Sequence, residues 1–202
     1  MLDRWTLRLI KRPLHGVARQ LDKRHVSANQ VTLGGFAVGL TALPLLTVEW
    51  YGLALLAIAL NRIADGLDGE LARLNKPSDG GAFLDIVLDF LFYAAIIAGF
   101  ALARPDSNAL AAALLLFGFM GTGSSFLAFA IQAERRGLTS MSYPSKGFYY
   151  LGGITEGTET IAFFVLMCLF PDAFVLLASV FFVLCVLTTA TRVIGGFHTL
   201  RT

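Results

Sequence analysis

The sequence is poor in cysteine, with only Cys168 and Cys185 among 202 residues. Both lie in late apolar stretches, where cysteine commonly acts as a small buried hydrophobic residue. We therefore expect neither a disulfide nor a zinc site, because the Cys/His spacing typical of zinc is also missing. The chain has no glycine-rich phosphate loop and no Gly-x-Ser-x-Gly motif, which argues against the enzyme classes built on those motifs.

The N-terminal region does not have the pattern of a cleavable secretory signal. Seven Lys/Arg lie in the first 25 residues, but no compact apolar core with a small-residue cleavage site follows them. The formal net charge of +2 is close to neutral and says little by itself. It gives no reason to expect a nucleic-acid partner, which a strongly basic domain would favour.

Apolar residues are abundant, at 56% of the chain, and they occur in blocks of about 20 residues, the length of a membrane-spanning helix. We predict an all-α membrane protein with a single domain over residues 1–202. A six-helix transmembrane bundle is expected over 31–194. The second apolar run is short and needs the polar residues 65–73 to complete a span. The expected spans are about 31–48, 50–64, 81–103, 108–132, 148–170 and 173–194.

Basic residues are distributed unevenly between the two sides of the membrane. Arg104 alone is expected on one side, and the other Lys and Arg residues on the opposite side. The positive-inside rule then places both termini in the cytoplasm. Residues 1–26 mix apolar and basic side chains, which predicts an amphipathic interfacial helix on the cytoplasmic leaflet, broken at Pro13; a solvated basic tail is the alternative. Ser27-Ala28-Asn29 is expected to start the helix of the first span, with a side chain capping its free amides. The cytoplasmic connections hold Arg62, Arg73, Lys76, Arg135, Arg136 and Lys146.

Four aspartates lie where a membrane segment should be apolar. Asp65 and Asp68 are separated by three positions, and Asp85 and Asp89 by four, so each pair lies on one face of a helix. The connection between the two helices is short, so they are expected to be antiparallel neighbours. Their acidic faces then meet at the same depth, near the cytoplasmic interface.

Four facing carboxylates need compensation, since each mid-membrane acid costs roughly 2.5–3.5 kcal/mol of insertion free energy. Two divalent cations would balance them, and hard oxygen ligands favour Mg²⁺ or Mn²⁺. Such ions with open coordination positions suit a diphosphate substrate. Salt bridges or helix caps are the alternative, and we expect Asp79 to be a cap or turn residue. Too few basic residues lie near the other four aspartates to pair them.

The spacing of these residues resembles the signature of the CDP-alcohol phosphotransferases. It reads Asp65-x-x-Asp68-Gly69-x-x-Ala72-Arg73, followed by Gly81-x-x-x-Asp85-x-x-x-Asp89. Seven residues separate Arg73 from Gly81, whereas the family usually has eight. The six-span layout and the Asn29-x-x-Thr32 entry to the first span are also similar to the family.

The resemblance implies transfer of a phosphatidyl group from a CDP-linked lipid, such as CDP-diacylglycerol, to an alcohol. The lipid binds at the cytoplasmic face, and CMP and a phosphodiester lipid are the products. Two divalent cations, Mg²⁺ or Mn²⁺, are implied as cofactors. Asp89 is implied to complete the second metal site and to act as general base on the acceptor hydroxyl. The implied metal ligands are Asp65, Asp68, Asp85 and Asp89, and the implied CDP site holds Asp68, Gly69, Ala72, Arg73 and Gly81.

The acceptor alcohol cannot be read from the shared motif. Basic residues at the cytoplasmic ends of the last two spans could hold an anionic acceptor or a headgroup, or serve as ordinary anchors. The acids in the fifth span could face a neutral or amine-bearing alcohol, or simply bond to Arg192 or Lys146. Family members that use a phosphorylated acceptor tend to carry arginines where Gly157 and Thr160 stand here. The candidate acceptor residues are Lys146, Glu156, Glu159 and Arg192.

Three other functions stay open at this point. A close alternative is phosphatidylglycerophosphate synthase, with Lys146 and Arg192 holding glycerol phosphate. A divalent cation transporter could use the aspartates as its site, although no internal repeat is visible. A non-catalytic scaffold is the third. The resemblance suggests a homodimer in a bacterial inner membrane, and Gly121–Ser125 offer small residues for close helix contact.

Overall fold

A computed structural model describes residues 3–138 and 153–201, and these residues contain helices and turns but no strand. The prediction of an all-α protein is therefore confirmed for the described ranges. The helices are α1 (Asp3–Lys23), α2 (Ala28–Leu40), α3 (Ala42–Thr47), α4 (Tyr51–Asn75), α5 (Asp79–Ala103), α6 (Pro105–Arg135), α7 (Gly157–Leu169), the 3-10 helix η1 (Pro171–Ala173) and α8 (Phe174–Arg201).

Four segments are long and apolar enough to cross a membrane: α2 with α3, α5, α6, and η1 with α8. Helix α4 is as long as α5, at 25 residues, but it carries more charged side chains. Helix α7 has only 13 residues. The predicted fifth span therefore starts too early at 148. Helix α7 begins at Gly157 because Glu156 and Glu159 form a capping box there; residues 148–152 lie outside the described ranges.

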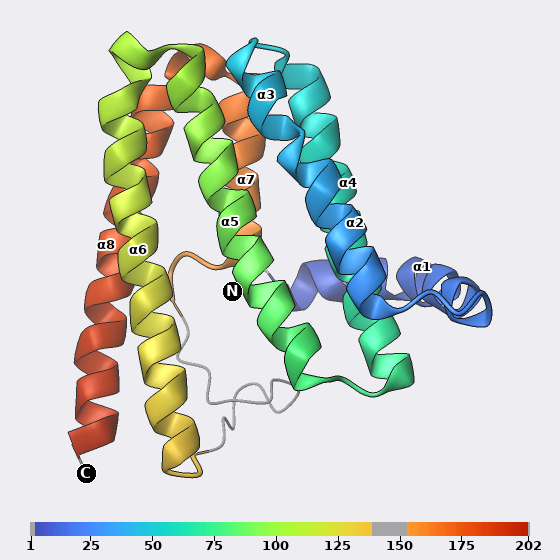
Figure 1. Ribbon diagram of the computed structural model, residues 1–202. Coiled ribbons are helices and arrows are strands. Elements are labelled where there is room, and N and C mark those ends of the chain that lie inside the picture. Colours follow the sequence, from blue (N-terminus) through green and yellow to red (C-terminus); the bar gives the residue numbers. More distant parts are fainter. Residues whose placement is uncertain (1–2, 139–152, 202) are drawn as a thin grey trace.

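The helices pack as an elongated bundle (Figure 1). Helices α2, α3 and α4 pack together as one group, and α6 packs on α8 as another. Helix α5 connects the two groups, because it contacts α2, α3 and α6. Helix α7 packs on α4 and α8. The core is rich in buried aromatic rings, such as the stacked pair Phe100 and Phe174, whose centroids are 4.8 Å apart. This packing holds α4 and α5 at fixed positions relative to each other.

The two ends of the bundle carry different connections. The connection between α4 and α5 lies toward the same end as the C-terminus (Figure 1). At the other end, Arg104 joins three connections by pairing with Glu49, at 2.7 Å, and with Asp172. The hydrogen bond from Arg104 holds the pKa of the exposed Glu49 carboxyl below its ordinary value.

Helix α1 is continuous, so the predicted break at Pro13 is wrong. A proline removes one helical hydrogen bond and can bend a helix without ending it. The second half of α1 is held by packing on α4: Ala18 is fully buried, and the Asn75 amide donates to Asp22 over 2.8 Å. The interfacial role of this helix stays a prediction, as does the homodimer.

Two serines fix where the key helices begin. Ser27 caps α2 as predicted, since its hydroxyl accepts from the Gln30 amide while the Gln30 side chain accepts from the Ser27 amide. Ser78 caps α5 by accepting from the Gly81 amide over 3.1 Å. Asp79, which was expected to be a cap or turn residue, is instead the first residue of the helix.

Helices α2 and α4 approach closely at Gly35. A Cβ atom added to Gly35 would collide with the Cβ of Ala64, whereas one added to the neighbouring Gly34 would meet open space. We expect Gly35→Ala to destabilise the protein by about 1–3 kcal/mol, because the two helices must separate. Thermal unfolding in detergent measures this, with Gly34→Ala as the matched control. Equal unfolding temperatures for the two variants would contradict the close packing.

Candidate functional site

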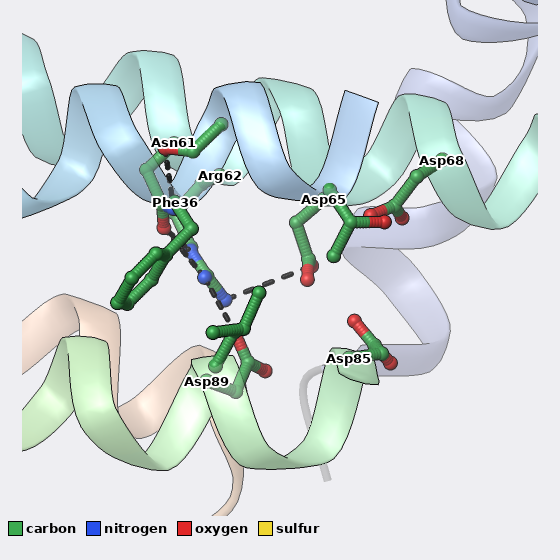
Figure 2. Close-up of a pocket in the computed structure, with 10 residues that line it drawn as sticks. Phe36, Asn61, Arg62, Asp65, Asp68, Asp85 and Asp89 are labelled. Carbon is green, nitrogen blue, oxygen red and sulfur yellow. Dashed lines mark hydrogen bonds and ion pairs between the residues drawn. The ribbon is translucent and has the colours of Figure 1, made fainter. Parts of the chain in front are cut away.

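All four predicted aspartates line one pocket between α4 and α5 (Figure 2). Asp65 and Asp68 come from α4, and Asp85 and Asp89 come from α5. The two helices are joined by three residues, 76–78, and both pack on α2, so their acidic side chains face one pocket as expected. The pocket is lined by Thr32, Gly35, Phe36, Asn61, Arg62, Asp65, Asp68, Asp85, Leu88 and Asp89.

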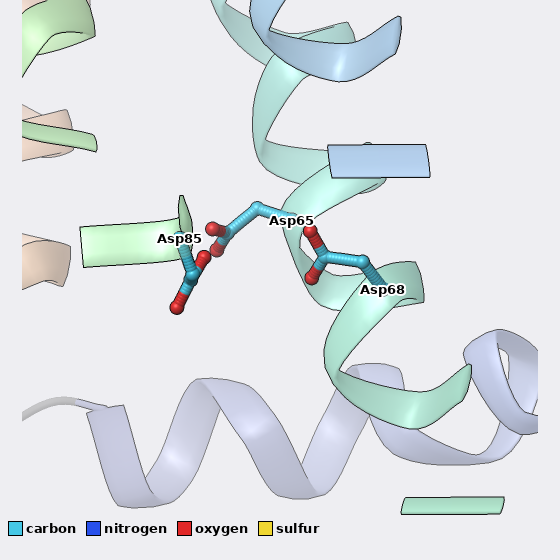
Figure 3. A group of neighbouring side chains, drawn as sticks. All are labelled: Asp65, Asp68 and Asp85. Atoms are coloured by element: carbon cyan, nitrogen blue, oxygen red, sulfur yellow. The ribbon is translucent and has the colours of Figure 1, made fainter. Parts of the chain in front are cut away.

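Three of the carboxylates form a close group (Figure 3). Asp65, Asp68 and Asp85 each offer an oxygen within 4.8 Å of the others. Asp68 is buried, and its Oδ2 atom has no hydrogen-bond partner within the described ranges. A buried carboxylate oxygen of this kind needs a compensating group. A donor set made only of carboxylate oxygens fits a hard divalent cation such as Mg²⁺ or Mn²⁺.

Asp89 lies outside that close group and has partners of its own. Its Oδ1 atom is 2.7 Å from Nη2 of Arg62, and its Oδ2 atom accepts a hydrogen bond from the Tyr93 hydroxyl over 3.3 Å. Arg62 also lies 3.6 Å from Oδ2 of Asp65. Arg62 therefore pairs with two of the four aspartates, and, among the described residues that line the pocket, basic side chains are too few to pair all four, as expected.

Arg62 was predicted only as a positive charge of the connection between the second and third spans. Arg62 precedes Asp65 by three positions, so both residues lie on the same face of α4, and this spacing is the signal that was missed. Tyr93 follows Asp89 by four positions on α5 and could have been found in the same way. The structure thus adds these two polar side chains to the four aspartates.

The residues expected to bind CDP lie next to the pocket, on the same stretch of α4 and at the start of α5. Arg73 is paired with the buried Glu70 at 2.7 Å. A Cβ atom added to Gly69 would lie 3.6 Å from the Arg73 guanidinium. One added to Gly81 would lie 3.1 Å from both Asn29 and Ser78. A side chain at Gly81 would therefore crowd this part of the site, whereas a Cβ atom at Gly69 would make ordinary contact with Arg73.

Three of the candidate acceptor residues lie near the start of α7. The Gly153 amide donates to the Glu156 carboxylate over 3.4 Å, and a Cβ atom added to Gly153 would lie 3.0 Å from Nη2 of Arg192. Glu156 and Glu159 cap the start of α7, and the Glu159 carboxylate accepts from the Glu156 amide over 3.2 Å. Arg192 is buried between α6 and α8, where it donates to the carbonyl of Thr122 over 3.1 Å. Lys146 lies outside the described residues. None of the other three is among the residues that line the aspartate pocket.

The start of α7 nevertheless comes close to this pocket. A Cβ atom added to Gly157 would lie 4.0 Å from the hydroxyl of Tyr93, which is the partner of Asp89. Helix α7 also packs on α4. The capped end of α7 therefore borders the side of the site where Asp89 lies.

Residues 25–193 match the model of the CDP-alcohol phosphatidyltransferases. The chain belongs to this family. The matched range includes α2 to α7, most of α8 and all four aspartates. Membership identifies the chain as an enzyme that transfers phosphatidyl-type groups and as an integral membrane protein. It favours this activity over the cation transporter and over the non-catalytic scaffold.

Known relatives and solved structures agree with the family assignment. The chain is 54% identical over 201 residues to the inner membrane protein YnjF of Escherichia coli, covering 100% of this chain and 98% of that protein. It is 36% identical over 94 residues to archaetidylinositol phosphate synthase of Pyrococcus horikoshii, covering 46% of this chain and 50% of that one.

The fold is similar to that of phosphatidylinositol phosphate synthase from Mycobacterium tuberculosis. The structure of that enzyme with manganese and citrate has a TM-score of 0.72 at 22% identity, over 94% of this chain and 89% of that chain. Its structure with CDP-DAG bound has a TM-score of 0.69 at 18% identity, over 91% and 93% of the two chains. At these identities the similarity establishes the fold.

Proposed function

We propose that this protein transfers a phosphatidyl group from a CDP-linked lipid, such as CDP-diacylglycerol, to an alcohol and releases CMP. The observation that carries the proposal is the pocket between α4 and α5, in which four aspartates converge with the spacing of the family signature. Family members solved with CDP-DAG and with manganese support the choice of donor and of cofactor.

Asp65, Asp68 and Asp85 would hold one divalent cation, and Asp89 would complete the site of a second. When bound, such cations stabilise negative charge on the diphosphate as CMP departs. The buried and unpartnered Oδ2 atom of Asp68 supports this assignment. Two divalent cations carry as many positive charges as the four carboxylates carry negative ones.

Asp89 is the residue proposed to accept the proton of the acceptor hydroxyl. An alcohol is a weak nucleophile, so it needs a base within hydrogen-bond reach. The acceptor oxygen then bonds to the phosphorus next to the diacylglycerol, and the bond from this phosphorus to the CMP oxygen breaks. Asp89 suits this role because it lies beside the close group of carboxylates and is partly open, with a side chain 30% exposed.

The CDP part of the donor is proposed to lie along Asp68, Gly69, Ala72, Arg73 and Gly81. The two glycines leave the backbone open to the nucleotide, and Arg73 can turn from Glu70 to the phosphate oxygens, since its side chain is 57% exposed. Both glycines flank the aspartate pocket, so a diphosphate bound there would reach the carboxylate cluster.

We propose that α4 and α7 also cross the membrane, with both termini in the cytoplasm of a bacterial cell. The distribution of basic residues supports this orientation, and the similarity to YnjF supports an inner membrane. Helix α4 would then place its charged C-terminal half, which carries Asp65 and Asp68, near the cytoplasmic surface, where a CDP-linked donor has access. Helix α1 would lie along that surface.

The acceptor can be identified by a panel of alcohols. Purified protein is incubated with CDP-diacylglycerol and Mn²⁺, and CMP release is measured with serine, glycerol 3-phosphate, inositol, inositol phosphate and glycerol. We expect release with one class of acceptor and none after addition of a chelator. Phosphatidylglycerophosphate synthesis requires release with glycerol 3-phosphate. If protein that binds Mn²⁺ released no CMP with any of these acceptors, the proposed donor would be contradicted.

A further inference from the structure

The strongest feature that the family signature does not explain is the ion pair between Arg62 and Asp89. Arg62 is the one basic side chain among the described residues that line the aspartate pocket. Its side chain is 18% exposed, and its guanidinium lies 2.7 Å from Asp89 and 3.6 Å from Asp65. It therefore occupies the space between the close group of carboxylates and the fourth aspartate (Figure 2).

The position of Arg62 is fixed by several neighbours. The side-chain oxygen of Asn61 accepts from Nε over 2.9 Å, and the amide of Asn61 is in turn anchored on the carbonyl of Gly35 over 3.0 Å. The guanidinium carbon lies over the rings of Phe92, at 4.9 Å, and Tyr93, at 5.5 Å. A guanidinium held by these contacts has a fixed position in the site, unlike a solvated surface charge.

The charges explain what such a residue can do. Four carboxylates and one guanidinium leave a formal charge of −3 in the pocket if every group is ionised. Asp65, Asp68 and Asp85 can take up one divalent cation without Arg62. Asp89 can join a second cation only if its oxygen leaves the guanidinium, since both cations attract the same carboxylate. The second position should therefore bind its cation more weakly than the first.

We propose that Arg62 is an internal counter-ion that holds Asp89 until a second divalent cation displaces it. This inference rests on the proposed function and deepens it. Arg62 compensates Asp89 when the second position is empty and lowers the affinity of that position when a cation competes. Arg62 is thus a positioning residue that acts through Asp89, and the first cation binds independently of it.

Mn²⁺ titration of purified protein in detergent, followed by the electron paramagnetic resonance of free Mn²⁺, tests this directly. We expect wild-type protein to bind one Mn²⁺ tightly and a second more weakly. In Arg62→Gln the second affinity should rise by about tenfold, a typical size for coupling between two sites. Arg62→Lys, which keeps the charge, should stay close to wild type.

Thermal unfolding in the presence of a chelator gives a second readout. Arg62→Gln should unfold at a lower temperature than wild type, because Asp89 loses the guanidinium that compensates its charge. Added Mn²⁺ should remove this difference in unfolding temperature. The double variant Arg62→Gln/Asp89→Asn should recover most of the loss, since both charges are gone. Arg104→Gln is the matched control, because Arg104 is also ion-paired but lies about 22 Å along α5 from Asp89.

The outcomes separate this inference from the proposed function. Equal Mn²⁺ number and affinity in wild type and Arg62→Gln would overturn the counter-ion role while leaving the transferase proposal intact. A double variant as unstable as Arg62→Gln would also overturn it, because packing on Phe92 and Tyr93 would then be the whole role of Arg62. Wild-type protein that binds no Mn²⁺ would contradict the proposed function itself.

Discussion

Asp89→Asn is expected to release CMP about 10²–10⁴-fold more slowly than the wild type, which is the usual contribution of a general base. The amide of asparagine cannot accept the proton of the acceptor hydroxyl, although it keeps nearly the same size. The first cation should still bind, because Asp65, Asp68 and Asp85 form their close group without Asp89. The measurement is the rate of CMP release at saturating Mn²⁺, with binding of the first Mn²⁺ as the check on folding.

Asp79→Asn is the matched control for this variant. Asp79 begins the helix that carries Asp89, but it is exposed and is not among the residues that line the pocket. We expect Asp79→Asn to release CMP at nearly the wild-type rate. If Asp89→Asn kept wild-type activity, Asp89 would not be the base, and the assignment of roles in the pocket would have to change.

Asp68→Asn is expected to lower the affinity for the first Mn²⁺ by more than about 100-fold. Loss of a residue that only supports a metal ligand already costs 10–100-fold in affinity, and Asp68 is proposed as a ligand itself. In a chelator, the same variant should unfold at a higher temperature than wild type, because it relieves repulsion in the carboxylate group. Opposite changes in affinity and stability distinguish a metal site from an ordinary structural acid.

The measurements are Mn²⁺ titration and thermal unfolding with and without a chelator. Asp106→Asn is a suitable control, since Asp106 lies in the exposed first turn of α6. Its Mn²⁺ affinity should equal that of the wild type. An Asp68→Asn protein with unchanged Mn²⁺ affinity would contradict the proposed metal group.

The pairing of the aspartates could be predicted because it depends on local rules. Helical spacing of three and four positions puts Asp65 with Asp68, and Asp85 with Asp89, whatever the rest of the fold does. The short connection then makes the two helices run in opposite directions, and both pack on α2, so their aspartates face the same pocket. The cap at Ser27 was predictable for the same reason, since the hydrogen bonds join residues three apart.

Other features depend on distances between helices, which the sequence does not contain. Spacing alone makes all four aspartates equivalent, whereas the structure separates Asp89 from the close group and gives it Arg62. The late start of α7 was readable in principle, since Glu156-x-x-Glu159 is a capping box. It was missed because apolar residues precede and follow it, so hydrophobicity alone suggested one long span.

Donor CDP-diacylglycerol that is labelled on the phosphorus next to the diacylglycerol tests the central claim most directly. The protein is given Mn²⁺ and the panel of alcohols, and both the lipid fraction and CMP are quantified. Phosphatidyl transfer predicts that the label moves into a new phosphodiester lipid, with one CMP released for each product molecule. Label that stays in the donor while Mn²⁺ is bound, or that appears as phosphatidic acid whatever alcohol is added, would contradict the account.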